Sequence, residues 1–183
     1  MRNVISGLFV SLDGVVEAPD QWQVNDVFAD EDMDAALLKA ISNQDDVLLG
    51  RVTYQEWVNY WPNAGSDQDY AKFINNVPKH VISSTLESVN WQNSRLVRGN
   101  PYEAVARLKQ SSGGDIGVQG SPTLARGLLM NGLLDRLTLV VLPVIVGNGR
   151  RLFDGWDGLQ RMALVESQVT GSGVALLTYE PLR

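Results

Sequence analysis

Two short segments of the chain combine residues that suit the binding of a phosphate. In each segment an apolar run ends in glycine, at Gly50 and at Gly120, and a helix-forming run begins directly afterwards. The start of a helix presents unpaired N–H groups and a partial positive charge, and glycine lets a ligand approach the backbone. Arg51 adds a forked cation to the first segment. The pattern therefore predicts two anion sites.

The residues that follow support this interpretation, and each also has an ordinary structural explanation. Ser121 and Thr123 offer hydroxyl donors at the second segment, but with Pro122 they are also good helix-capping chemistry. Ser83 and Ser84 end a third strand-like run, where they could bind ribose or phosphate or simply lead from strand to loop. Neither glycine segment matches the GxGxxG or the Walker pattern.

A long irregular stretch after the first strand could cover a bound ligand. Residues 12–27 contain Asp13-Gly14 and Pro19-Asp20 as turn signals, and such a loop in a compact domain is often functional. Asp13 is the candidate proton donor or substrate hydrogen-bonding group, with a simple turn residue as the alternative. Trp22 lies in the same loop and could stack on a flat substrate.

The composition excludes several classes of chemistry. The 183 residues include no cysteine, which rules out thiol catalysis, disulfides and Cys-ligated zinc or iron–sulfur clusters, and we expect no metal. The single histidine, His80, lies beside a strand-like run, and we interpret it as structural. The formal net charge of -6 argues against a nucleic-acid partner and means that a bound anion needs local cations.

Length and hydropathy predict one domain over residues 1–183. Hydrophobic residues make up 44% and charged residues 20% of the chain, which is ordinary globular composition. No apolar run reaches the roughly 20 residues that a membrane helix needs, and the N-terminus shows no signal peptide. We therefore expect a cytoplasmic protein that binds a small molecule and neither a membrane nor nucleic acid.

Strands and helices alternate at short spacing, which is typical of an α/β fold. The predicted strands are 3–11, 46–49, 80–83, 95–97, 116–119, 136–146, 163–170 and 173–180. The predicted helices are 30–43, 51–60, one that Ser66 caps and Pro78 ends, one from Pro101 to Gly113-Gly114, and 122–130. Because Gly171-Ser172 suits a hairpin turn, the last two strands should be antiparallel beside a mostly parallel sheet.

Four motifs occur in an order and spacing that cover nearly the whole chain. They are Ser11-Leu12-Asp13-Gly14, Gly50-Arg51-Val52-Thr53-Tyr54, Gly120-Ser121-Pro122-Thr123-Leu124 and Leu142-Pro143-Val144-Ile145-Val146-Gly147-Asn148-Gly149. Together they resemble the dihydrofolate reductase-like superfamily. More closely, the chain resembles the C-terminal reductase domain of the bifunctional riboflavin-biosynthesis deaminase–reductase.

This resemblance implies an NADPH-dependent reductase, of the 5-amino-6-(5-phosphoribosylamino)uracil reductase type, with a three-layer αβα fold. Its sheet would be central, mostly parallel and eight-stranded, with the antiparallel hairpin at its C-terminal end. The implied cofactor-binding residues are Gly50, Arg51, Thr53, Ser83, Ser84, Gly120, Ser121, Thr123 and Leu124. The implied substrate-binding residues are Ser11, Gly14 and Trp22, beside Asp13 as the catalytic residue and a late loop at 147–149. Members of the family commonly dimerise, which implies a homodimer.

The chain departs from the family in ways that leave two functions open. It has no cysteine and no His-x-Glu motif, so we expect a stand-alone reductase without a deaminase. Four acidic residues occupy the region where dihydrofolate reductase keeps its proton donor, namely Asp30, Glu31, Asp32 and Asp34, and none is singled out. The first hypothesis is hydride transfer to a small heterocyclic (pterin- or pyrimidine-like) or carbonyl substrate. The second is a non-catalytic nucleotide-binding protein that keeps the same fold.

Overall fold

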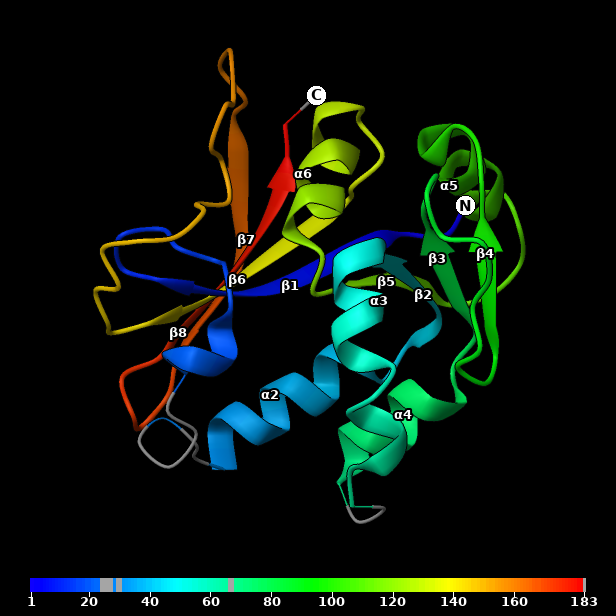
Figure 1. Ribbon diagram of the computed structural model, residues 1–183. Helices are drawn as coiled ribbons and strands as arrows, with labels where there is room; N and C mark the ends of the chain where they lie inside the picture. The colour runs from blue at the N-terminus through cyan, green and yellow to red at the C-terminus, as the bar shows by residue number, and fades with distance from the viewer. Residues whose placement is uncertain (24–27, 29–30, 66–67, 183) are drawn as a thin grey trace.

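The computed structural model describes residues 1–23, 28, 31–65 and 68–182, and its strands form one mixed sheet (Figure 1). The strands are β1 (Val4–Ser11), β2 (Gln44–Gly50), β3 (Lys79–Ile82), β4 (Ser94–Val97), β5 (Asp115–Gln119), β6 (Arg136–Leu142), β7 (Met162–Val169) and β8 (Ala175–Pro181). Their order across the sheet is β4-β3-β2-β5-β1-β6-β8-β7. The pairs from β4 to β6 are parallel, whereas β8 runs antiparallel to both β6 and β7.

Helices cover both faces of this sheet, which confirms the three-layer αβα prediction. The described helices are α2 (Glu31–Ile41), α3 (Arg51–Trp57), α4 (Asp69–Asn76), α5 (Pro101–Lys109) and α6 (Pro122–Met130), with single 3-10 turns at Pro19–Gln21 and Trp61–Asn63. Apolar residues of α5 and α6 pack with β1 and β5 on one face. On the other face α4 packs over β2 and β3, and α2 packs over β6 and β8 (Figure 1). None of the helices in the described part of the chain is long and apolar enough to cross a membrane.

The element boundaries agree with the sequence in most places and differ for identifiable reasons. The strand predicted to reach Val146 ends at Leu142, because Pro143 follows and cannot donate to a ladder. The predicted capping residue Ser66 and the predicted helix start at Asp30 lie outside the described residues. Asn100 caps α5 as predicted, since its Oδ1 accepts the N–H of Tyr102 at 3.0 Å.

A partly buried chain of polar contacts joins the amino ends of four parallel strands. The Arg2 guanidinium is bonded to Asp46, whose Oδ1 lies 2.5 Å from His80 Nε2. Arg95 Nε donates to His80 Nδ1 at 2.8 Å, so the proton of the neutral ring resides on Nε2 and is donated to Asp46. Burial lowers the pKa of His80 and favours this neutral form. The interpretation of His80 as a structural residue therefore fits its place at the edge opposite the two glycine turns.

At the carboxyl edge of the sheet, the chain connections that follow β2 and β5 run in opposite directions. From β2 the chain continues through α3 and α4 to β3, away from β5. From β5 it continues through α6 across β1 to β6, in the opposite direction. Ligands of open α/β sheets bind where neighbouring connections diverge in this way. Both glycine turns of the sequence lie at this point.

Candidate functional site

The two glycine turns are hydrogen-bonded to each other. The backbone N–H of Gly50 donates to Ser121 Oγ at 2.8 Å, and Ser121 Oγ lies 2.9 Å from Thr53 Oγ1, to which it donates. The backbone N–H of Ser121 donates to the same Thr53 oxygen at 3.1 Å. Three hydrogen bonds thus join the end of β2 and the start of α3 to the end of β5 and the start of α6. The predicted cofactor residues Gly50, Thr53, Gly120 and Ser121 therefore come together.

The second turn is tight and leaves the start of α6 open. Gly120 has φ 51°, and Ser121, although it carries a side chain, has φ 54° and ψ 54°. A Cβ on Gly120 would lie 2.9 Å from Thr53 Cγ2, so the first turn packs against the glycine backbone. Ser121 is the N-cap of α6 but makes no side-chain capping bond, because its hydroxyl serves Gly50 and Thr53 instead. The first N–H groups of α6 therefore have no acceptor from the side chain of their own cap.

The remaining predicted cofactor residues differ in how exposed their side chains are and in whether other residues already occupy them. Arg51 is exposed at the start of α3, with its Nη1 donating to the neutral Gln55 amide at 2.7 Å. Thr123 is exposed on the first turn of α6, whereas the side chain of Leu124 packs against the core. The hydroxyl of Ser83 accepts two backbone N–H groups of the following turn.

Ser84 is exposed at the end of β3, beside the buried Ser83. Ser83 is 8% exposed, and its hydroxyl is occupied by the turn that it accepts from. Of this pair, Ser84 is the residue whose side chain a ligand can reach. The end of β3 lies next to that of β2 in the sheet, so both serines are at the same edge as the paired turns.

Asp13 is held as an acceptor of hydrogen bonds from a distant loop. Its Oδ1 accepts the Ser11 hydroxyl at 2.7 Å and the N–H of Val146 at 3.0 Å, and its Oδ2 accepts the N–H of Gly147 at 3.0 Å. Arg151 Nη2 lies 3.3 Å from Oδ2. The Ser11 hydroxyl and these backbone N–H groups lower the pKa of Asp13 from its ordinary 3.8 to about 2. Such a carboxylate is ionised at neutral pH, which is the wrong protonation state for the predicted proton donor.

The described part of the loop after β1 (residues 12–23, the covering loop) and the late loop, which extends over residues 143–151, are joined by hydrogen bonds. Leu12 N donates to Val144 O at 2.8 Å, and Val16 N donates to Arg150 O at 3.0 Å. Val15 and Arg151 form an isolated antiparallel bridge. Gly14, with φ 85°, makes the turn that this arrangement requires. The sequence indicated that both loops border one cleft but gave no sign that Arg151 and Asp13 connect them.

Around Gly7, the described residues leave a strip of the sheet uncovered. Gly7 lies in the central strand β1, is exposed, and has no atom of the described residues within 4 Å of the position that a Cβ would take. Phe9, on the same face of β1, already packs with the α2 cluster. The strip therefore lies between the parts of this face that α2 and α4 cover. The sequence signal for this strip is a lone glycine inside an apolar strand, which often marks the close approach of a ligand, but Gly7 belongs to none of the four motifs.

The neighbours of Gly7 give this strip a polar but uncharged character. Gln119 of β5 and Thr138 of β6 are its register partners. Tyr70 donates its hydroxyl to Gln119 Oε1 at 3.1 Å, and the hydroxyls of Thr138 and Thr178 lie 2.9 Å apart. The predicted substrate residue Trp22 packs at one side of this face, its Nε1 donating to Glu17 O at 2.8 Å.

The αβα sandwich, with its mostly parallel eight-stranded sheet and paired turns, defines a protein of the dihydrofolate reductase-like class. Within that class the chain belongs to the RibD C-terminal domain family, whose model matches residues 2–176. Uncharacterized protein YyaP of Bacillus subtilis (strain 168) is 28% identical over 181 residues, covering 97% of this chain and 94% of that protein.

Two solved structures show the same fold. One is a protein of Shewanella sp. PV-4 assigned to riboflavin biosynthesis, with a TM-score of 0.79, 21% identity and coverage of 99% of both chains. The other is dihydrofolate reductase from Enterococcus faecalis, complexed with NADP(H) and RAB-propyl. It has a TM-score of 0.61 and 13% identity, covering 99% of this chain and 97% of that one. The predicted family and fold are thereby confirmed.

The contact between the two turns predicts unequal costs for two glycine substitutions. Gly132→Ala adds a Cβ at φ 65° in open space, and we expect it to lower the free energy of unfolding by about 1 kcal/mol. Gly120→Ala adds the same backbone strain and a Cβ 2.9 Å from Thr53, so it should cost about 1–3 kcal/mol more. Denaturant titration of both variants measures the difference, and equal losses would contradict the close packing of the turns.

The hydrogen bonds of Asp13 predict its titration. Carbon-13 NMR of the Asp13 carboxyl should give a pKa of about 2, and Ser11→Ala should raise it towards 3.8 because the Ser11 hydroxyl is the largest cause of the shift. The folded-state pKa is depressed, so the contact stabilises the loops above pH 3.8 and is lost as the pH falls through about 2. Ser84→Ala is the matched control and should leave the titration unchanged. A wild-type midpoint at 3.8 would contradict the geometry.

Proposed function

We propose that this chain is an NADPH-dependent reductase that transfers a hydride to a small heterocyclic, pterin- or pyrimidine-like, or carbonyl substrate. One observation carries the proposal: the starts of α3 and α6 meet through the Gly50–Ser121 hydrogen bond at the point where the connections of β2 and β5 diverge. This arrangement gathers backbone donors for one dinucleotide at one edge of the sheet. The family membership supports the same assignment.

The residues present fit a nicotinamide dinucleotide. The turn at Gly120 leaves no room for a Cβ, and the hydroxyl of Ser121 is withdrawn from capping, so the start of α6 is left for a phosphate. Arg51 and Ser84 are exposed at the ends of β2 and β3, where they would hold the adenosine side of the cofactor. The bound cofactor supplies the hydride, and the protein supplies orientation and exclusion of water.

The strip around Gly7 suits a flat substrate without a charge. Gly7 itself lets an aromatic ring approach the backbone of β1. Gln119 and Thr138 on either side offer neutral donors and acceptors for the edge of a heterocycle. Asp13 acts in this scheme as a positioning residue that holds the late loop, and the proton reaches the product from another source, such as water.

The alternative, a nucleotide-binding protein without catalysis, is favoured by one observation. Asp13, the candidate proton donor of the covering loop, is ionised and engaged by backbone N–H groups. A protein of this kind would bind NADPH but would not oxidise it. Incubation of NADPH with a panel of pterins, pyrimidines, flavins and ketones separates the two functions by the loss of absorbance at 340 nm.

Titration of NADPH fluorescence tests the cofactor assignment. We expect micromolar-range binding by the wild type and a Kd raised about ten- to a hundredfold in Arg51→Ala, because a charge-assisted hydrogen bond to phosphate is lost. Arg107→Ala is the matched control. It removes an exposed arginine of α5 whose carboxylate partner Glu103 lies at 3.9 Å, and it should leave the Kd unchanged. Absence of NADPH and NADH binding by the wild type refutes both proposed functions.

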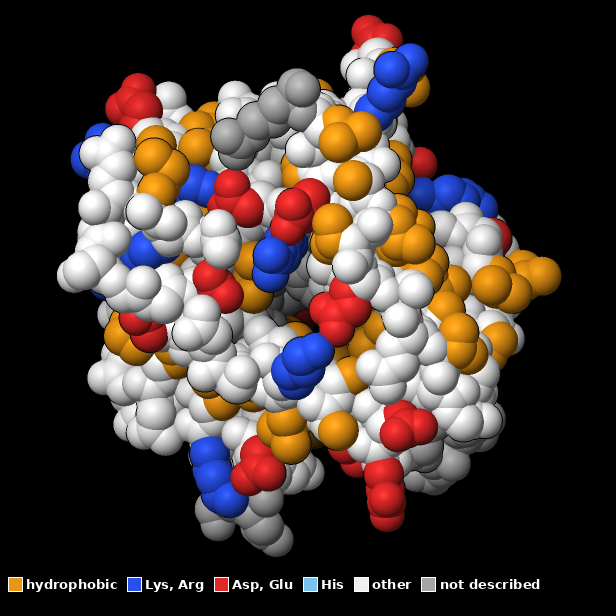
Figure 2. Space-filling view, turned by 180° about the vertical axis from the view of Figure 1, so that it is seen from behind, with side chains coloured by type: hydrophobic (Ala, Val, Ile, Leu, Met, Phe, Trp, Pro, Cys, Tyr) orange, Lys and Arg blue, Asp and Glu red, His pale blue; other side chains and the backbone are white. Residues whose placement is uncertain are grey.

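We also infer that the protein acts in the cytoplasm as a homodimer. β7 ends the sheet order, and its apolar side chains are exposed, with Leu164 at 53%, Val165 at 48% and Val169 at 70%. Figure 2 shows hydrophobic side chains exposed along the side of the molecule on which β7 lies. Such an edge normally carries charge or a cover. Light scattering should give the dimer mass for the wild type and the monomer mass for Val165→Lys/Val169→Lys; a monomeric wild type disproves the inference.

A further inference from the structure

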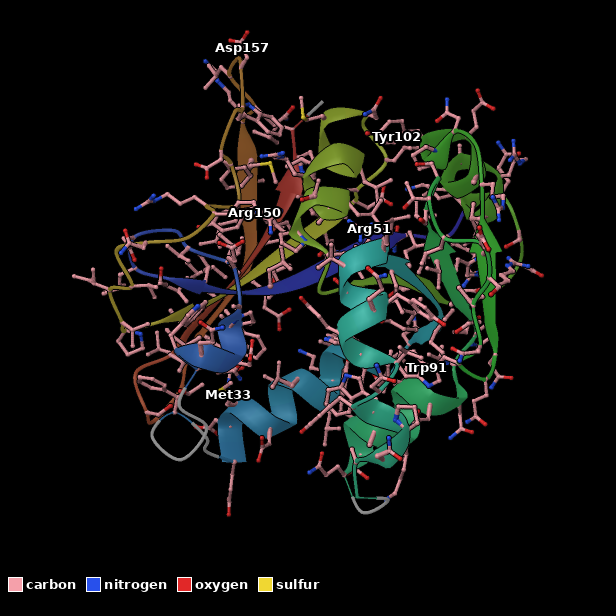
Figure 3. The ribbon with its side chains drawn as sticks, viewed as in Figure 1. Met33, Arg51, Trp91, Tyr102, Arg150 and Asp157 are labelled. Atoms are coloured by element: carbon pink, nitrogen blue, oxygen red, sulfur yellow. The ribbon has the colours of Figure 1, made fainter. Side chains whose placement is uncertain are left out.

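Arg150 reaches the start of α6 from a different part of the chain. It belongs to the late loop after β6, and its Nη1 donates to Thr123 Oγ1 at 3.4 Å. Figure 3 shows Arg51 at the start of α3 and Arg150 on the far side of the α6 start. The two arginines therefore flank the paired turns, one from each side.

A carboxylate of the protein already occupies the Arg150 fork. Glu17 Oε1 lies 3.1 Å from Arg150 Nη2, and Glu17 Oε2 accepts the backbone N–H of Arg150, also at 3.1 Å. Both side chains are about half exposed, at 47% for Glu17 and 48% for Arg150. An ion pair at such exposure contributes little free energy, so another anion can replace the carboxylate at small cost. Glu17 thus holds the guanidinium of Arg150 in place, and another anion can still replace the Glu17 carboxylate.

A phosphate bound at the start of α6 would need a cation beside it. The first turn of α6 contains no acidic side chain, and its N-cap serine does not cap it. The protein as a whole carries a net charge of -6, which opposes an incoming anion unless local cations offset it. Arg151, the other arginine of this loop, is engaged by Asp13 and its backbone oxygen. Arg150 is the arginine of the late loop that contacts α6.

We propose that Arg150 binds the diphosphate of the cofactor at the start of α6, and that Glu17 holds the Arg150 guanidinium in the free protein and yields it on binding. The inference rests on the proposed function, because it adds a ligand to the same cofactor site. The diphosphate is favoured over the 2′-phosphate because Thr123 is on α6, after β5. The serines at the end of β3 are separated from β5 by β2.

Affinities of NADPH and NADH measured on four proteins test this assignment. The proteins are the wild type, Arg150→Gln, Glu17→Gln and the double variant. Because both nucleotides share the diphosphate, Arg150→Gln should raise both Kd values by the same factor, about tenfold. Glu17→Gln should lower both about two- to fivefold, since the competing carboxylate is gone. In the Arg150→Gln background the Glu17→Gln change should have no effect.

The outcomes separate this assignment from the proposed function. If Arg51→Ala weakens NADPH binding and Arg150→Gln does not, the function stands and the assignment of Arg150 is wrong. A loss of affinity confined to NADPH would place Arg150 at the 2′-phosphate and would also overturn its assignment to the diphosphate. Weaker binding by Glu17→Gln would overturn the proposal that the phosphate replaces Glu17 as the partner of Arg150. Wild-type protein that binds neither nucleotide removes the function and the assignment together. Arg107→Gln, with the same change in net charge, should leave the Kd values of both NADPH and NADH at the wild-type level.

Discussion

The site depends on the hydrogen-bond partners of the Ser121 hydroxyl. As the N-cap of α6 it could accept a hydrogen bond from its own helix, yet it accepts the N–H of Gly50 and donates to Thr53. Ser121 is 6% exposed and Thr53 8%, so these bonds are shielded from water and fix two helix starts as one surface. Because this hydroxyl does not cap α6, the first N–H groups of the helix remain available to a ligand. The left-handed backbone of Gly120 and Ser121 makes the contact possible.

The covering loop depends in turn on a carboxylate that accepts rather than donates. Asp13 receives N–H groups from residues 146 and 147, and the two loops thereby become one wall beside β1. An ionised carboxylate has about four acceptor sites and forms charge-assisted hydrogen bonds, so it can satisfy more donors, and more strongly, than the single acceptor oxygen of a neutral side chain. Its place in an Asp-Gly turn and its function in binding the late loop are thus compatible. The joined loops reach α6 through Arg150, and the covering loop continues from β1, the strand that contains Gly7.

Features that follow from local pattern could be predicted, and features that depend on distant contacts could not. The pairing of Gly50 and Gly120 follows because glycine-to-helix turns after neighbouring parallel strands meet at one edge of a sheet. The hairpin at Gly171-Ser172 likewise follows from its turn residues. The sequence left Asp13 open as a proton donor, a substrate hydrogen-bonding group or a turn residue, because the backbone N–H groups that it accepts come from more than 130 residues away. The contact of Arg150 with α6 could not be predicted, because the sequence does not show that its loop returns to α6.

The electrostatics of the site explain how an acidic protein can present a surface for a phosphate. Arg151 is paired with Asp13 and Arg150 with Glu17, so the late loop contributes almost no net charge while it awaits a ligand. Arg51 contacts the neutral amide of Gln55 and provides the positive end of the surface. Binding of an anion beside Arg150 exchanges one carboxylate for another anion, so no charge is left buried and unpaired at any stage. Affinity then depends on the geometry of the paired turns, because the net charge of the protein opposes the ligand throughout.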